Sequence, residues 1–351
     1  MKKLLFISAL FIFASWSDVQ AQDRSRLFEN PGPLELKLDF SFKKLKKETN
    51  DSTLMDEVMY YREGSDDWDS IKVQMRKRGN FRLQNCYFPP VKLNIKKKER
   101  KETIFEDDKK LKLVLPCLNT KATNALIIKE YLCYQIYEKV TPFSFHTRLT
   151  PVEVTEHRKN KDKVFNLLAF LVEDDKQVAK RNTGEIMKDA IVHPLRLHDT
   201  TAVRFAIFKY LIANMDWSTV YQHNAKIMKT KDPYRIIPLA YDFDQSGFVD
   251  ASYAILNPEW ESAAVNPANV RADVKDRIYR GYCRENDPLM YAVRDEYLVI
   301  EDEVYGIIEA YKKYLDDTDY KSLQKFVEGF FDTLEDNEAF KAEIIDRCRT
   351  K

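Results

Sequence analysis

The first half of the chain consists largely of short runs in which apolar and polar residues alternate, the pattern of half-buried strands. In the run 34–42, for example, Leu36, Leu38 and Phe40 fall on one face. Comparable runs predict further strands at 70–76, 90–95, 111–115, 146–155 and 164–173. The charged stretches 43–52 and 96–110 are expected to be exposed connections. We therefore predict an antiparallel sheet in this half, with one helix inserted between its strands.

That helix is predicted at 124–138, where apolar residues such as Leu126, Tyr131 and Tyr134 recur every three or four positions. Glu130 lies near the middle of the same helix. The second half is predicted to contain an apolar helix at 200–214, two short strands at 225–229 and 235–241, and charged helices over 287–351. Together these elements predict an α+β fold, with a β-rich N-terminal lobe at 22–175 and a mainly helical C-terminal lobe at 176–351.

The first 21 residues have the three parts of a secretory signal peptide. Lys2 and Lys3 precede an apolar run at 4–16, and small side chains stand before an expected cleavage site after Ala21. The run is shorter than the roughly 20 apolar residues that cross a bilayer. We therefore expect an exported protein with no transmembrane segment after signal cleavage, located in a periplasm, at the cell surface or outside the cell.

The charge balance bears on the class of partner. The 351 residues include 57 basic and 56 acidic ones, which gives a net charge of +1. Proteins that bind nucleic acids usually carry a basic domain or a basic face, so we expect no nucleic-acid partner. Hydrophobic residues make up 44% of the chain and can supply a large core.

The five cysteines contain no C-x-x-C pair, so their spacing does not indicate a zinc or thioredoxin-type site. In an oxidising compartment, Cys86 and Cys117 are the first candidates for a disulfide because both stand beside predicted strands. Buried free thiols are the alternative. An odd number leaves one cysteine unpaired in either case.

The residues with the clearest chemical pattern lie between 212 and 247. Asp216 follows the apolar helix, Asn224 comes just before a strand, and Asp242 and Asp244 follow the next strand. A hairpin of these two strands would bring Asn224 close to Asp242. Carboxylate and amide oxygens suit Mg²⁺ or Mn²⁺, and Mg²⁺ commonly binds one or two carboxylates together with substrate phosphates.

This order of elements is that of phosphoryl-transfer enzymes, and on these residues the chain resembles the CotH-type (spore-coat protein H-like) atypical kinase family. The matching segments are Arg78-Gly79-Asn80, 89–93, 110–113, the helix around Glu130, 168–173 and the block from Asp216 to Asp244. The resemblance covers about residues 70–250. It implies a bilobed protein-kinase-like fold that binds ATP and a divalent metal and phosphorylates Ser or Thr of a protein acceptor.

The resemblance also implies a role for individual residues. Asp216 corresponds to the catalytic aspartate and Asp242 to the metal-binding aspartate. Asn224 is expected to hold the metal together with Asp242, and Asp244 to add a further ligand. Kinases pair a strand lysine with a helix glutamate to hold the nucleotide phosphates. Lys92 is our first choice for that lysine and Lys112 the second, with Glu130 as the partner.

The pattern departs from that of protein kinases in two places. Asn224 comes eight positions after Asp216, where protein kinases have five, and Gly79 stands alone without a G-x-G-x-x-G loop. Two other functions are therefore kept open. One is a catalytically inactive binding or surface-assembly protein on the same scaffold, and the other is a metal-dependent hydrolase that uses the carboxylates on water. The acceptor, the preferred nucleotide and metal, and the oligomeric state do not follow from the sequence.

Overall fold

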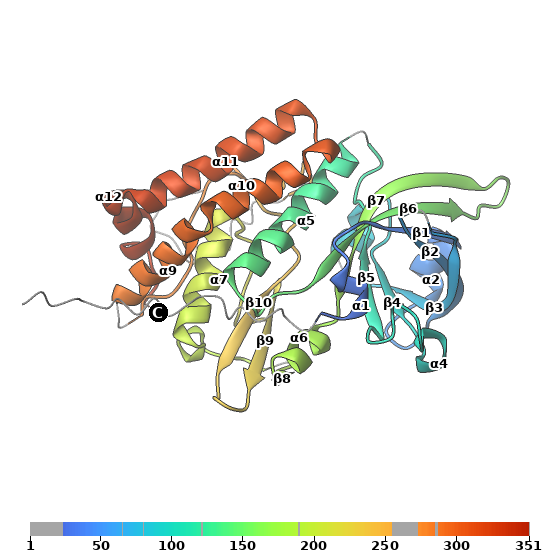
Figure 1. The fold of residues 1–351 in the computed structure, drawn as a ribbon, viewed down its shortest axis with the longest axis horizontal. Helices are drawn as coiled ribbons and strands as arrows, with labels where there is room; N and C mark the ends of the chain where they lie inside the picture. Colours follow the sequence, from blue (N-terminus) through green and yellow to red (C-terminus); the bar gives the residue numbers. More distant parts are fainter. Residues whose placement is uncertain are drawn as a thin grey trace, which may run out of the picture.

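The computed structural model describes residues 24–64, 66–79, 81–120, 122–188, 190–254, 273–284 and 287–350. The predicted signal peptide at 1–21 lies outside these residues. Strands are concentrated in the N-terminal half and helices in the C-terminal half (Figure 1). In the described part of the chain no helix is both long enough and apolar enough to cross a membrane.

Seven strands of the N-terminal half close into a barrel in the order β1-β2-β3-β4-β5-β7-β6. The strands are β1 (Leu34–Phe40), β2 (Met55–Glu63), β3 (Asp69–Lys77), β4 (Val91–Asn94), β5 (Lys110–Val114), β6 (Thr147–Glu156) and β7 (Lys163–Glu173). All neighbours are antiparallel except β1 and β6, which run parallel and close the sheet. Short helices precede or connect the strands of the barrel: α1 (Arg26–Glu29), α2 (Phe42–Glu48), α3 (Phe81–Asn85) and α4 (Lys97–Arg100).

The closed barrel shows that the expected bilobed protein-kinase-like fold is wrong. The alternating pattern identified most of the strands, but β2 and helix α2 were not predicted. Closure depends on the pairing of β1 with β6, for example Leu36 with Val152. Residues so far apart along the chain leave no local signal, because alternation shows which side chains face the core and not which strands become neighbours.

The barrel has an apolar interior of its own. Inward-facing residues such as Leu38, Met75, Leu93 and Leu113 are fully buried there. Arg148 on β6 is among the largest fully buried side chains of the described residues, and it links the N-terminal segment to the barrel. Its guanidinium donates to the carbonyl oxygens of Leu27 and Gly32 at 3.0 and 2.9 Å and to Glu63 at 2.6 Å.

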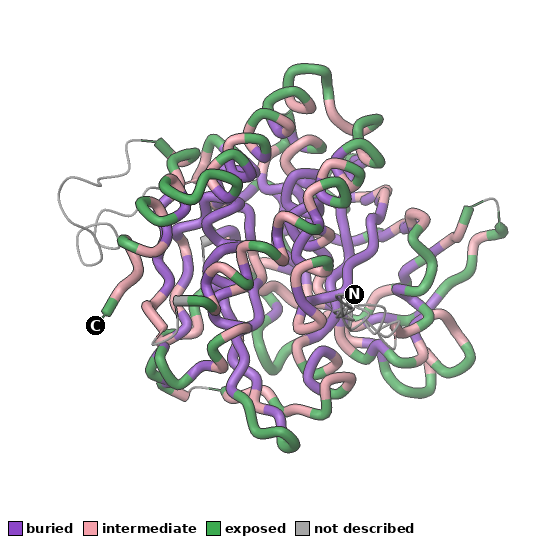
Figure 2. Tube along the Cα trace, turned by 60° about the vertical axis from the view of Figure 1, so that its left-hand side comes forward, coloured by how far each residue is buried: buried purple, intermediate pink, exposed green. Residues whose placement is uncertain are grey.

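The C-terminal half packs around two buried helices, α5 (Thr123–Val140) and α7 (Asp199–Leu211). Helices α9 (Asp287–Val299), α10 (Glu301–Ala310) and α11 (Asp317–Glu335) cover them, and α12 (Asn337–Phe340) follows (Figure 1). Figure 2 shows the buried segments in the interior, with exposed segments outside. Helix α6 (Asp175–Arg181) connects the barrel to a three-stranded sheet of β8 (Gly184–Ile186), β9 (Ala225–Thr230) and β10 (Ile236–Ala240).

Two disulfides are present in the described residues. Cys86 bonds to Cys117, as predicted, and Cys283 bonds to Cys348. Cys133 is a buried free thiol. Disulfides persist mainly in oxidising compartments, so both bonds are compatible with export.

We expect Arg148→Met to lower the free energy of unfolding by about 2–4 kcal/mol, because it leaves Glu63 and two carbonyl oxygens without their donor. Urea denaturation followed by circular dichroism measures this change. The control is Arg26→Met, which removes an exposed arginine from an exposed partner, Glu106, and should have a much smaller effect. Equal losses in the two variants would contradict the role of Arg148.

Candidate functional site

The β9–β10 hairpin brings together the two polar loops that the sequence singled out. Ala225 lies opposite Ala240 in the antiparallel register, so Asn224 and Asp242 flank the same end of the hairpin. Asp216 belongs to the loop that follows α7 and leads into β9. The predicted hairpin is therefore confirmed.

The loop that carries Asp216 folds back on itself. Two backbone hydrogen bonds of 2.9 Å join Ser218 and His223, which accommodates the eight-residue spacing between Asp216 and Asn224. The side-chain amide nitrogen of Asn224 donates to the carboxylate of Asp216 at 2.7 Å and to the backbone carbonyl oxygen of Asp216 at 2.8 Å. His223 Nε2 lies 2.7 Å from the other carboxylate oxygen. The hydrogen bond to Asp216 raises the pKa of His223, against the opposing effect of burial.

Asp242 is held among cations in a left-handed backbone conformation, with φ of 61°. Its backbone N–H donates to the hydroxyl oxygen of Tyr134 at 2.9 Å, and Arg78 lies 3.8 Å from its carboxylate. Burial disfavours the charged carboxylate, but Arg78, Arg82 and Lys112 outweigh burial and hold the pKa of Asp242 below its usual range. Asp242 is therefore an anion at neutral pH.

Lys112 and Lys92 lie opposite each other on β5 and β4, yet they have different partners. The ammonium of Lys112 is 4.4 Å from the ring centre of Tyr241, the residue before Asp242. Burial, reinforced by the nearby charge of Arg78, lowers the pKa of Lys112 to about 7, although Asp242 opposes the shift. The ammonium of Lys92 contacts Asp174 at 3.2 Å.

Glu130 and Asp244 share one cation, Arg82 of α3. The guanidinium lies 3.8 Å from Glu130 and 3.9 Å from Asp244, and it donates to the carbonyl oxygen of Leu115. All three side chains are buried. Burial raises the pKa of both carboxyls, and each is raised further by the neighbouring negative charges, while Arg82 opposes the shift. Glu130 is therefore paired with Arg82, and Lys92 is paired with Asp174. The expected pair of Lys92 with Glu130 is not formed.

Sequence reasoning missed two residues that help to build this site. Arg82 lies in the short helix α3, and no motif in the sequence marked it. Lys209 is the other: it interrupts the otherwise apolar end of α7. Its ammonium donates to the side chain of Asn214 at 3.3 Å and lies over the ring of Phe243 at 4.7 Å. A charged residue within an apolar helix was the signal that could have found it.

The segment that precedes α9 contacts the loop that carries Asp216. Arg280 donates to the carbonyl oxygens of Met215 and Trp217, the two neighbours of Asp216. The Cys283–Cys348 disulfide and a backbone hydrogen bond of 2.9 Å from Arg349 to Gly281 anchor this segment to the C-terminal end of the described chain. The disulfide therefore fixes the segment that positions the Asp216 loop.

The expected metal ligands can be tested against their surroundings. Within the described residues no group of three or more His, Cys, Asp or Glu side chains could hold a metal ion by itself. One carboxylate oxygen of Asp244 is nevertheless buried and accepts no hydrogen bond. Asp242 and Asn224 face the same end of the hairpin. The side-chain oxygens of these three residues fit a cation that takes its other ligands from a bound phosphate.

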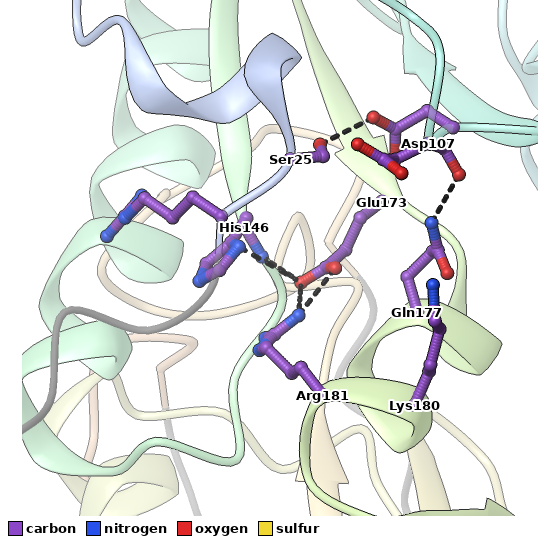
Figure 3. A pocket seen from close by; sticks show the side chains of 9 residues that line it. Ser25, Asp107, His146, Glu173, Gln177, Lys180 and Arg181 are labelled. Carbon is purple, nitrogen blue, oxygen red and sulfur yellow. Dashed lines mark hydrogen bonds and ion pairs between the residues drawn. The ribbon is translucent and has the colours of Figure 1, made fainter.

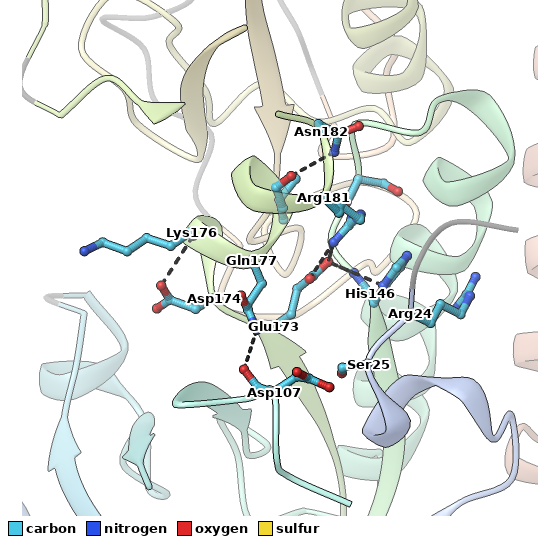
Figure 4. A network of polar contacts seen from close by, with 12 residues as sticks. Arg24, Ser25, Asp107, His146, Glu173, Asp174, Lys176, Gln177, Arg181 and Asn182 are labelled. Atoms are coloured by element: carbon cyan, nitrogen blue, oxygen red, sulfur yellow. Dashed lines mark hydrogen bonds and ion pairs between the residues drawn. The ribbon is translucent and has the colours of Figure 1, made fainter. Parts of the chain in front are cut away.

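A separate polar pocket of about 240 Å³ lies where the N-terminal segment, the barrel and α6 meet (Figure 3). Arg181 binds both oxygens of Glu173 at 2.6 Å, and the same carboxylate accepts the backbone N–H of His146. Ser25 donates to Asp108. Figure 4 shows the same network from another side, with Glu173 at its centre. Because Glu173 and Asp108 are already bound by these donors, we assign this network a structural role at the junction.

Comparison with known proteins leaves the family open. No protein-family profile matches the chain, and no curated protein matches it. Among solved structures, the crystal structure of the Helicobacter pylori proinflammatory kinase CtkA aligns with a TM-score of 0.35 and 13% identity, over 73% of this chain and 91% of that one. A similarity this weak supports no assignment, and the resemblance to the CotH-type family stays a prediction.

The disulfide that anchors the Arg280 segment gives a test of loop positioning. We expect the double variant Cys283→Ser/Cys348→Ser to show amide hydrogen exchange several-fold faster at residues 213–218, because Arg280 is then less firmly held. The matched control, Cys86→Ser/Cys117→Ser, should speed exchange around 82–88 and leave 213–218 unchanged. Unchanged exchange at 213–218 in the first variant would show that Arg280 does not depend on the disulfide.

The pocket of Figure 3 gives a pH-dependent prediction through Asp108. Burial raises the pKa of Asp108 from 3.8 to about 6, although the hydrogen bond from Ser25 opposes the shift. The folded state thus holds this proton more tightly than the unfolded chain, and the resulting stability is lost as the pH rises from about 4 to about 6. Relative to the wild type, Asp108→Asn should gain up to about 3 kcal/mol over this range.

Urea denaturation at several pH values between 4 and 7 measures this gain. Asp66→Asn, which changes an exposed carboxylate, is the control and should keep a constant difference from the wild type. A constant difference for Asp108→Asn as well would contradict the raised pKa.

Proposed function

We propose that this chain binds a nucleoside triphosphate, with ATP as the leading candidate, and transfers its terminal phosphoryl group to a Ser or Thr hydroxyl of a protein acceptor. One observation carries the proposal: Asp216 with Asn224, and Asp242 with Lys112 and Arg78, meet at the end of one hairpin. Carboxylates, an amide and two cations in one place are the groups that phosphoryl transfer uses.

Each residue has a distinct role in this proposal. Lys112 and Arg78 bind the phosphate oxygens, a role for which Lys112 is better placed than Lys92 because Lys92 contacts Asp174. Asp242 and Asn224 hold the divalent cation, Mg²⁺ or Mn²⁺, and Asp244 supplies a further oxygen. The cation neutralises charge on the phosphates.

The transfer itself depends on Asp216. The acceptor hydroxyl oxygen forms a bond to the terminal phosphorus, the bond from that phosphorus to its bridging oxygen breaks, and the nucleoside diphosphate leaves. Asp216 orients the hydroxyl and takes its proton. Hydrogen bonds from Asn224 and the contact with His223 fix this carboxylate, so little reorganisation is needed at the moment of transfer.

A catalytically inactive binding or assembly protein is the second candidate, because arginines already face the two metal-binding carboxylates. Arg78 contacts Asp242, and Arg82 contacts Asp244. Asp244 also stands where protein kinases carry a glycine. In either case we propose that the protein is exported, which agrees with its two disulfides.

A thermal-shift titration with ATP, with and without Mn²⁺ or Mg²⁺, tests the proposed site. A ligand that binds only the folded state adds about 2.7 kcal/mol of stability at a hundredfold excess over its dissociation constant. We expect a metal-dependent shift that is lost in Asp242→Asn and in Lys112→Met. Lys92→Met is the matched control and should keep most of the shift.

Three outcomes separate the candidates. Loss of the shift in Lys92→Met but not in Lys112→Met would reverse the roles of the two lysines. No shift in folded wild-type protein would contradict nucleotide binding. A normal shift without phosphoryl transfer to any protein acceptor would favour the inactive binding protein.

A further inference from the structure

A second pocket, of about 350 Å³, lies where the start of β5 faces α6. We call it the lysine pocket, after the residues that line it: Arg100, Lys109, Lys110, Lys176 and Lys180, with Asp107, Asp174 and Gln177. Five cations therefore face two carboxylates. One of these carboxylates, Asp174, is already paired with Lys92 at 3.2 Å. The lining thus has a clear excess of positive charge, although the chain as a whole is nearly neutral.

The excess charge is not neutralised by the surrounding protein. Among the residues that the structure describes, the five cations have no carboxylate partner within ion-pair distance, whereas neighbouring Lys92, Lys98 and Lys101 each have one. The Nε atom of Arg100 is buried and makes no hydrogen bond. A buried polar atom without a partner is costly, so a ligand that supplies an acceptor to Arg100 would stabilise the pocket.

Repulsion within the pocket is visible at Lys110. Burial lowers the pKa of this lysine, and the charges of Lys92 and Lys176 lower it further, while Asp174 opposes them. Bringing like charges together costs free energy that a bound anion would recover. This repulsion and the geometry of the pocket both favour a bound anion.

The walls of the pocket are held in place independently of any ligand. The side chain of Gln177 donates to the carbonyl oxygen of Asp107 and so joins α6 to the loop before β5 (Figure 3). Asp174 caps the start of α6 by accepting the backbone N–H of Lys176. In Figure 4 the Lys176 side chain points away from Glu173 and Arg181. The lysine pocket adjoins the pocket of Figure 3, because Asp107, Gln177 and Lys180 line both.

We infer that the lysine pocket binds a small ligand with two or more adjacent phosphate groups. Several ammonium groups around a space of this size match the dense charge of linked phosphates, to which lysine is well suited as a point charge. Single carboxylates spaced along an acidic peptide present less charge in the same volume. The inference stands apart from the proposed phosphoryl transfer, because the lining of the pocket includes none of the residues to which that reaction is assigned.

Isothermal titration calorimetry of the purified full chain with inorganic tripolyphosphate, in EDTA and at low salt, tests the inference. We expect saturable binding that weakens as salt is added. Lys110→Ala/Lys176→Ala should weaken it at least tenfold, as should the charge reversal Lys109→Glu/Lys180→Glu. The matched control is Lys321→Ala/Lys325→Ala, which removes two exposed lysines of α11 and should leave the affinity unchanged.

The same titration with ATP in EDTA distinguishes the sources of the phosphates. Equal affinity for ATP and tripolyphosphate supports recognition of the phosphates alone, and tighter binding of ATP supports a nucleotide as the natural ligand. Poly-glutamate that binds while tripolyphosphate does not would overturn the inference in favour of an acidic protein partner. Absence of tripolyphosphate binding, or equal weakening in the α11 control, would also overturn it.

Lys112→Met separates this inference from the proposed function. We expect it to retain tripolyphosphate binding while losing the metal-dependent ATP shift. If it loses tripolyphosphate binding and Lys110→Ala/Lys176→Ala does not, the anion binds at the Asp242 site and the lysine pocket is not a site.

Discussion

The arrangement of the molecule depends on two arginines that compensate three carboxylates, two of them buried. Arg78 and Arg82 come from the segment between β3 and β4, and they face Asp242, Asp244 and Glu130, which belong to the loop after β10 and to α5. Breaking one partner of a buried ion pair typically costs several kcal/mol. The network therefore joins the barrel to the C-terminal half at the place where the candidate site is built.

The same network sets a condition on function. Arg78 keeps Asp242 ionised, and an ionised Asp242 is what a divalent cation requires. A cation that approaches Asp242 must nevertheless compete with Arg78. If the proposed function is correct, phosphates would resolve the competition, because they would give Arg78 and Lys112 new partners as the cation arrives. Metal and nucleotide should then bind together, each making the other's site more favourable.

The sequence predicted the local elements well and their assembly poorly. Alternation located β3 to β7 to within a few residues, and helical spacing located α5 and α7, because both patterns report which side chains face the core. The short hairpin also followed from sequence, since two apolar runs flank a turn that contains Pro233. Barrel closure did not follow, because it depends on the pairing of β1 with β6 across more than a hundred residues.

The candidate site was predictable to a similar extent. Asp216 and Asn224 precede the predicted hairpin and Asp242 follows it, so the sequence was enough to place these three residues together. The partners of Lys92 and Glu130 could not, because Asp174 and Arg82 reach them from segments whose placement only the tertiary fold determines. The Cys86–Cys117 bond was found from its neighbouring strands, whereas Cys283–Cys348 joins a segment without regular structure to the end of the chain.

A crystal structure with Mn²⁺ and a non-hydrolysable ATP analogue, both at saturating concentration, would show whether Asp242 and Lys112 bind metal and phosphate together. We expect an anomalous manganese peak bound to Asp242, phosphate oxygens on Lys112 and Arg78, and loss of the contact between Arg78 and Asp242. An intact Arg78–Asp242 contact with no manganese peak would contradict this expectation, and the loops at the end of the hairpin would then have a structural role only.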